Sequence, residues 1–238
     1  MRKLVKPRFL LAYPLAVWLL LAARTSERRF HLGIGIVLLG ALVRVWANGY
    51  VGHAKVNWTQ KWRGDPKIGS LITAGPYAFV RHPLYVGTLL IGGGFCLIAG
   101  NVWFSFAALG FFLIVYRRKM AEEEELLHGE VGTPYLIYQA AVPRWLPGWG
   151  RYPNRQGRWS WQGIVRSREW KTLIWVFIVI LALYFRGEIF QEQDWFAPDE
   201  RLKRVILIAS GLALMLTDVT IDLIARRKRR VKPAQAGG

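Results

Sequence analysis

The most informative stretch of the sequence is Gly75-Pro76-Tyr77-Ala78-Phe79-Val80-Arg81-His82-Pro83-Leu84-Tyr85-Val86-Gly87. It places polar residues directly before an apolar run that extends to Ala99. Gly75-Pro76 is a turn signal, and Pro83 suits the first turn of a helix, where a backbone N–H is not needed. The pattern therefore predicts a helix that begins at Pro83, with Arg81 and His82 at its N-terminus. Free backbone N–H groups and the helix dipole favour an anion there. By composition alone, the same pair equally suits an anchor in lipid headgroups.

Further apolar runs lie on both sides of this stretch. The candidate spans are Phe9–Ala23, Leu32–Ala47, Tyr85–Ala99, Val102–Tyr116, Leu173–Phe185 and Val205–Ala225. A membrane span takes about 20 mainly apolar residues, so several runs are short for isolated spans. The glycines within Gly33–Gly40 and Ile91–Gly94 indicate close helix packing. We therefore expect an all-α fold, a polytopic transmembrane helix bundle of about six spans.

The charge of the chain is concentrated between these runs. Among 238 residues there are 33 Lys and Arg against 15 Asp and Glu, a formal net charge of +18. In this pattern the excess indicates anionic lipid headgroups and no nucleic acid partner. Short basic loops stay in the cytoplasm, which predicts a multi-pass integral protein of a bacterial inner membrane with both termini cytoplasmic. The first run lacks a small-residue cleavage site and is interpreted as a helix, not a signal peptide.

A second polar cluster follows the fourth predicted span. Glu122–Glu125 lies on a helix expected to continue out of that span, and Tyr135, Tyr138 and Val142-Pro143-Arg144 come after it. Four adjacent carboxylates project all around a helix, so some of them face solvent and can pair with Arg117–Lys119. The functional interpretation is that one or two turn inward and bind a polar or cationic ligand.

Taken in order, the two clusters form one long pattern. It begins at Arg44-Val45-Trp46-Ala47-x-Gly49, includes the stretches 71–77 and 81–87 and the glutamates, and ends near Pro147. This pattern resembles the isoprenylcysteine carboxyl methyltransferase and phospholipid methyltransferase superfamily of integral membrane enzymes. The resemblance implies a single domain, residues 1–238, with a family-like core at 32–147 and two additional C-terminal spans within 172–225.

The resemblance also implies S-adenosylmethionine-dependent methyl transfer, with a cofactor pocket at the cytosolic membrane face. The methyl acceptor would be lipidic or prenylated and would react through a carboxylate, an amine or a thiol. The implied partners are this hydrophobic acceptor and membrane lipids. Carried over by motif, the cofactor-binding residues are Tyr77, Arg81, His82, Leu84, Tyr85, Gly87, Glu123, Glu124 and Tyr138. The catalytic candidates are Arg144 and Glu124. Counting back from Gly132 by the family's spacing selects Glu123 and Glu124 as the carboxylate pair. The neighbouring Glu122 and Glu125 leave this assignment open by one residue.

These residue types suit the chemistry of that cofactor. Arg81 or His82 at a helix N-terminus suits its carboxylate, and the glutamates can accept from its ammonium or ribose hydroxyls. A carboxylate acceptor is already ionised at neutral pH and needs no base, so Arg144 would orient it. An amine or thiol would need deprotonation by a glutamate or by His82.

Two other function classes stay open. One is an NADPH-dependent membrane reductase on a related scaffold, with the basic stretch Arg151–Arg168 contacting phosphate; the other is a non-enzymatic lipid-binding membrane protein. His31, His53 and His128 have no metal-like spacing with one another or with Cys96, so we predict no metal site.

Three segments lie outside the pattern or depart from it. Gly49–Ser70 is longer than expected and either covers the cofactor or is an interfacial loop with Trp anchors. Gly148–Trp161, rich in Arg and Trp, is interpreted as an interfacial stretch. In the last apolar run, Asp218, Asp222 and Arg226 follow one another at intervals of one helical turn. They either pair with one another, or Asp218 pairs with Arg44.

Overall fold

The computed structural model describes residues 18–19, 23, 25–51, 71–167 and 169–191, together with the isolated positions 205, 209, 213, 216 and 220. Within these residues every regular element is a helix and there is no strand, which confirms the all-α prediction. The predicted runs Phe9–Ala23 and Val205–Ala225 lie largely outside the described residues, so the count of six spans stays a prediction. Two compact units are distinguished, residues 1–170 and 171–238, and the single domain also stays a prediction.

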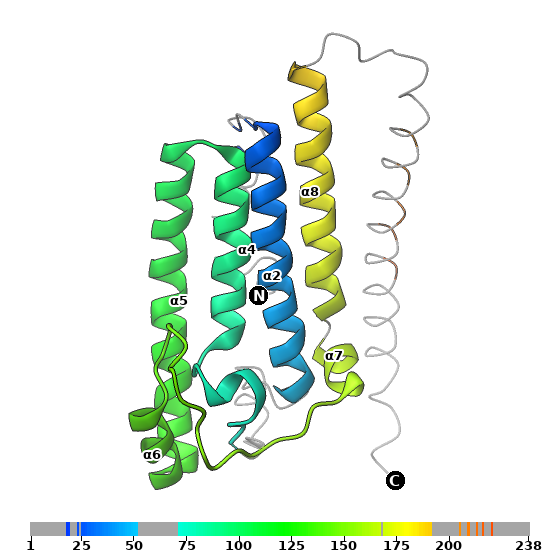
Figure 1. Ribbon diagram of the computed structural model, residues 1–238. Coiled ribbons are helices and arrows are strands. Elements are labelled where there is room, and N and C mark those ends of the chain that lie inside the picture. The colour runs from blue at the N-terminus through cyan, green and yellow to red at the C-terminus, as the bar shows by residue number, and fades with distance from the viewer. Residues whose placement is uncertain are drawn as a thin grey trace, which may run out of the picture. The chain divides into compact units, whose positions relative to one another are not determined.

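The first unit contains three long helices (Figure 1). They are α2 (Glu27–Val51), α4 (Pro83–Ala99) and α5 (Val102–Val131). The shorter elements of this unit are the 3-10 helix η1 (Gly75–Ala78), α6 (Thr133–Ala141) and α7 (Trp161–Ser167). Helix α8 (Glu169–Gln191) begins in the first unit and continues into the second.

Helix α4 begins at Pro83, as the sequence predicts, and a tight turn joins it to α5. Gly100 ends α4 in the left-handed conformation, at φ 57°, which glycine adopts without steric cost. The Asn101 side chain then accepts a hydrogen bond from the backbone N–H of Phe104 and caps the start of α5. Helix α5 runs well beyond its apolar part, and this extension carries the four glutamates.

Helices α2 and α4 pack at backbone contact through their glycines. A Cβ atom on Gly40 would lie 2.7 Å from the carbonyl oxygen of Gly87, and one on Gly94 would lie 2.7 Å from that of Gly33. Any side chain at these positions would therefore push the two helices apart. The close packing predicted from the glycine-rich runs is confirmed.

The outer surfaces of the long helices are apolar. Leu38 and Leu42 of α2 and Phe106 and Ile114 of α5 are exposed. Among the described helices, α2 is the one long and apolar enough to cross a membrane, and α4 is a shorter apolar helix. Exposed leucine and phenylalanine on helices of this kind suit contact with lipid tails.

The segment after α6 runs beside the segment that leads into α4. Backbone N–H groups of Arg81, Gly148 and Tyr152 donate to carbonyl oxygens across this contact, to Pro143, Phe79 and Ala78 respectively, at 2.8–2.9 Å. These bonds bring Arg144 to the start of α4. Farther along the same segment, Trp149 and Trp161 are exposed, and its location at the membrane interface stays a prediction.

Candidate functional site

Arg81 and His82 are held at the beginning of α4 by main-chain bonds. His82 is the N-cap residue, and its carbonyl oxygen accepts from the N–H groups of Tyr85 at 3.0 Å and Val86 at 3.1 Å. The His82 side chain is buried. A buried imidazole needs hydrogen-bond partners for its ring nitrogens, and α5 supplies one.

Glu124 is the centre of the polar cluster. Its Oε1 atom lies 2.9 Å from His82 Nε2 and accepts from Arg144 Nε at 3.0 Å, while Arg144 Nη2 donates to Oε2. Arg81 Nη1 forms an ion pair with Oε1 at 3.1 Å. Two segments, one carrying Arg81 and His82 and the other Arg144, thus converge on a carboxylate of α5.

The protonation state of Glu124 follows from these partners. Burial by itself raises the pKa of this carboxyl, but the hydrogen bonds from His82 and Arg144 and the charge of Arg81 outweigh it and lower the pKa from 4.5 to about 2. Glu124 is therefore ionised at neutral pH. An ionised carboxylate only accepts hydrogen bonds, so His82 Nε2 donates to it.

Glu123 lies beside this cluster and is partly open to solvent. Tyr85 Oη donates to its Oε1 atom at 2.6 Å, and its Oε2 atom lies 4.0 Å from His82 Nδ1. The side chain is 26% exposed, against 7% for Glu124. One Glu123 oxygen is therefore engaged by Tyr85 and the other is open to a further donor.

The outer two glutamates point away from the cluster. Glu122 pairs with Arg118 one turn earlier, at 3.6 Å, and Glu125 is exposed. Successive helical residues project about 100° apart, so only two neighbours can face the same side. The structure thus brings together the two glutamates named from the sequence, while their role in binding stays a prediction.

Arg81 has spare hydrogen-bonding capacity. Its Nη1 atom is in the ion pair with Glu124, whereas its buried Nε atom makes no hydrogen bond within the described part of the structure. A guanidinium carries five donors and stays charged, and buried polar groups of this kind are rarely left unpaired in a complete site. Arg81 is therefore the residue best suited to bind an additional anion.

Tyr77 and Tyr138 lie in a neighbouring aromatic core. Tyr138 Oη donates to the carbonyl oxygen of Tyr77 at 2.7 Å, and Tyr138 packs with Tyr135 and Tyr152. Burial raises the pKa of both the Tyr77 and the Tyr138 phenols above the usual value of 10.0, so both are neutral. In this structure Tyr138 ties α6 to η1.

Leu84 and Gly87 lie on the side of α4 that contacts α2. The carbonyl oxygen of Leu84 accepts from Arg44 Nη1 at 3.2 Å, and a Cβ on Gly87 would lie 2.8 Å from the carbonyl oxygen of Gly40. The geometry gives Gly87 a role in helix packing. Its place in the wall of a cofactor pocket stays a prediction.

Glu169 is a member of a polar cluster that was not predicted from the sequence. Arg44 pairs with this residue, whereas the partner considered from the sequence, Asp218, lies outside the described residues. One signal could have indicated it, because Glu169 is the only acidic residue in the basic stretch 151–171.

The chain resembles known methyltransferases over about half of its length. The sequence profile of the phospholipid methyltransferase family matches residues 9–129. Protein-S-isoprenylcysteine O-methyltransferase of Schizosaccharomyces pombe is 29% identical over 117 residues, which cover 48% of each chain. The protein of the same name from Xenopus laevis is 31% identical over 120 residues, 49% of this chain and 40% of that one. The chain thus matches less than half the length of these relatives, and no solved structure matches it significantly.

Proposed function

Because the chain belongs to the phospholipid methyltransferase family, whose members are integral membrane methyltransferases, we propose that it transfers a methyl group from S-adenosylmethionine to a lipidic or prenylated acceptor at the cytosolic membrane face. The single observation that carries this proposal is the convergence of Arg81, His82 and Arg144 on ionised Glu124, with Glu123 beside it. Positive and negative groups alternate there within hydrogen-bond distance.

This donor set fits the polar groups of the methyl donor. Arg81 has a buried Nε–H group without a hydrogen bond to any described residue and would hold the donor's carboxylate. Glu123 retains an oxygen that its Tyr85 bond leaves open and would accept from an ammonium or a ribose hydroxyl. When bound, S-adenosylmethionine supplies an electrophilic methyl group on its sulfonium.

The residues of the cluster would act by positioning. Glu124 holds His82 and Arg144 in fixed orientations, and orientation of reacting groups provides much of the acceleration in a displacement at carbon. Arg144 is the most exposed member, at 37%, and is proposed to orient the acceptor. The names of the two relatives favour an isoprenylated cysteine carboxylate as acceptor, and such a group is ionised at neutral pH without help from a base.

Calorimetry on purified protein in detergent tests the donor site. Wild type is expected to bind S-adenosylmethionine, and His82→Ala and Glu124→Ala are each expected to weaken binding by about 10- to 100-fold, the value of one charged hydrogen bond. Glu125→Ala removes the exposed neighbouring carboxylate and serves as the matched control. No binding by wild type, or equal affinities for all four proteins, would overturn the proposal.

The acceptor is tested with methyl-labelled donor and a prenylated cysteine. Transfer is expected to the free carboxylate and not to the same compound with its carboxylate blocked as an amide. Transfer to both would indicate that another atom accepts the methyl group. Titration with NADPH in parallel examines the reductase alternative, because cofactor-dependent stabilisation is expected only for a ligand that binds the folded state.

A further inference from the structure

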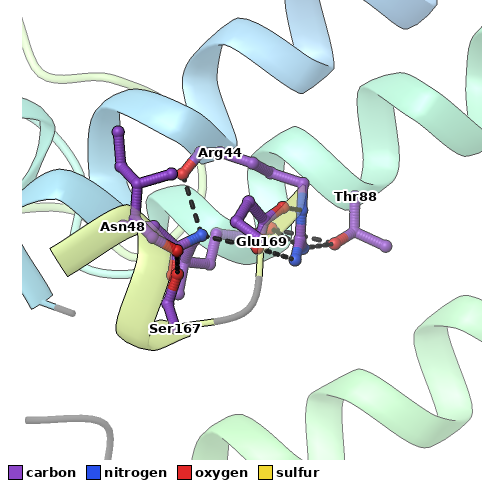
Figure 2. A network of polar contacts seen from close by, with 7 residues as sticks. Arg44, Asn48, Thr88, Ser167 and Glu169 are labelled. Carbon is purple, nitrogen blue, oxygen red and sulfur yellow. Dashed lines mark hydrogen bonds and ion pairs between the residues drawn. The ribbon is translucent and has the colours of Figure 1, made fainter. Parts of the chain in front are cut away.

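A second charged cluster contacts α4 at Leu84 and Thr88. Arg44 Nε donates to Glu169 Oε1 at 2.6 Å and Arg44 Nη2 to Oε2 at 3.0 Å (Figure 2). Asn48 Nδ2 donates to the same carboxylate at 2.7 Å and to the Arg44 carbonyl oxygen at 2.9 Å. The arginine comes from α2 and the glutamate from the first residue of α8, and they are 125 positions apart in the chain.

The remaining donor of Arg44 reaches the beginning of α4. Its Nη1 atom donates to Thr88 Oγ1 at 2.6 Å and to the carbonyl oxygen of Leu84 at 3.2 Å. Figure 2 shows Arg44 between Glu169 and Thr88. A planar guanidinium that is bound to a carboxylate through two nitrogens has little freedom to turn. Glu169 therefore fixes the direction in which Arg44 contacts α4.

The first turns of α4 are thus held from two sides. On one side Glu124 and Glu123 bind His82 and Tyr85, and on the other Arg44 binds Leu84 and Thr88. These four residues alternate within seven positions of one helix. A displacement of the Arg44 contacts would therefore move His82 and Tyr85 relative to the glutamates.

Stabilisation of the fold does not by itself explain the buried ion pair between Arg44 and Glu169. The Glu169 side chain is 2% exposed and that of Arg44 is 16% exposed, and the desolvation of two such charges offsets much of their attraction. Apolar side chains of similar size often replace buried ion pairs without loss of stability. A pair that contributes little net stability but fixes a geometry is suited to a positioning role.

We propose that Arg44, held by Glu169, is a positioning residue that places His82 and Tyr85 for cofactor binding. This inference rests on the proposed function, because it concerns the same site. Glu169 lies beyond the family match at 9–129. A residue outside the matched region therefore supports the candidate site.

The test removes the charges without leaving one of them unpaired. The double variant Arg44→Met/Glu169→Leu keeps the volume of both side chains, and Arg118→Met/Glu122→Leu makes the same changes at an exposed pair on α5 as a matched control. The first is expected to retain a wild-type melting temperature and to bind S-adenosylmethionine about 10- to 100-fold more weakly, the scale of loss for a misplacement of about 1 Å. The control is expected to bind as wild type. Arg44→Lys keeps the charge but replaces the planar guanidinium by a single ammonium nitrogen, so intermediate affinity is expected.

Hydrogen–deuterium exchange at residues 82–88 provides a readout that does not require activity. Faster exchange of these amides in Arg44→Met/Glu169→Leu, with α5 unchanged, is expected if the pair positions the start of α4. If wild type binds no cofactor, the proposed function fails while this exchange result still reports on the positioning. Wild-type affinity and wild-type exchange in the folded double variant would overturn the inference. Loss of affinity together with a large loss of melting temperature would also overturn it in favour of a purely structural pair.

Discussion

Replacing Glu124 by glutamine removes the negative charge shared by His82, Arg81 and Arg144 while keeping the size of the side chain. The size of the expected loss of stability follows from the pKa of the Glu124 carboxyl, which these partners lower from 4.5 to about 2. At about 1.4 kcal/mol for each tenfold change in the acid constant, the charged form is stabilised by roughly 3 kcal/mol in the folded state. The variant is expected to lose about this much free energy of unfolding at neutral pH, since the neutral amide cannot replace the charge.

Thermal unfolding in detergent measures the loss. The chain contains one cysteine, Cys96, in α4, so a maleimide dye that fluoresces on reaction reports the unfolding of this helix. A loss of roughly 3 kcal/mol corresponds to a melting temperature lower by about 6–12 °C in a chain of this size. Glu125→Gln, the same change at the exposed neighbour, is expected to melt within about 2 °C of wild type. A similar small shift for Glu124→Gln would refute the reasoning.

The pH dependence gives an independent check with a definite sign. A carboxyl whose pKa is lower in the folded state stabilises the protein fully above its unfolded pKa and loses that effect as the pH falls through the folded pKa. The difference in melting temperature between wild type and Glu124→Gln should therefore be constant from about pH 8 to pH 6 and shrink between about pH 5 and pH 2. A difference that instead grew in acid would contradict the assignment of the low pKa to Glu124.

Three further predictions concern packing, a buried hydrogen bond and the lipid interface. Gly40→Ala places a Cβ 2.7 Å from the Gly87 carbonyl oxygen and should cost about 1–3 kcal/mol. Gly92→Ala, which meets nothing within 4 Å, should leave the melting temperature unchanged or raise it; equal shifts would count against backbone contact of α2 and α4. Tyr138→Phe leaves a buried carbonyl without its donor and should cost about 1–3 kcal/mol by the same assay, whereas no shift would mean that water replaces the phenol. In liposomes, brominated lipids should quench wild type more than Trp149→Phe, because this exposed Trp suits the headgroup layer; equal quenching would place the residue in water.

Local signals in the sequence predicted local structure well. The Pro83 start of α4 and the packing glycines of α2 and α4 were both predictable, because each depends on the conformational properties of a residue and its near neighbours. The polar motifs likewise indicated Arg81, His82, Glu124 and Arg144 as members of a site, and the structure places them in one cluster. Gly87 belonged to the same motif, but it packs against α2 instead of facing the cluster.

What the sequence by itself determined is an all-α chain with apolar helices, a basic surface and two polar motifs at helix ends, since these features follow from periodicity, composition and backbone preferences. Only the tertiary structure decided which glutamates turn inward and which residue neutralises Arg44. Glu124 is distinguished from Glu122 and Glu125 by arginines and a histidine that other segments bring to it, and Glu169 reaches Arg44 across 125 positions. Electrostatic partners depend on distance in space, and four adjacent identical residues carry no local mark of which one will be buried.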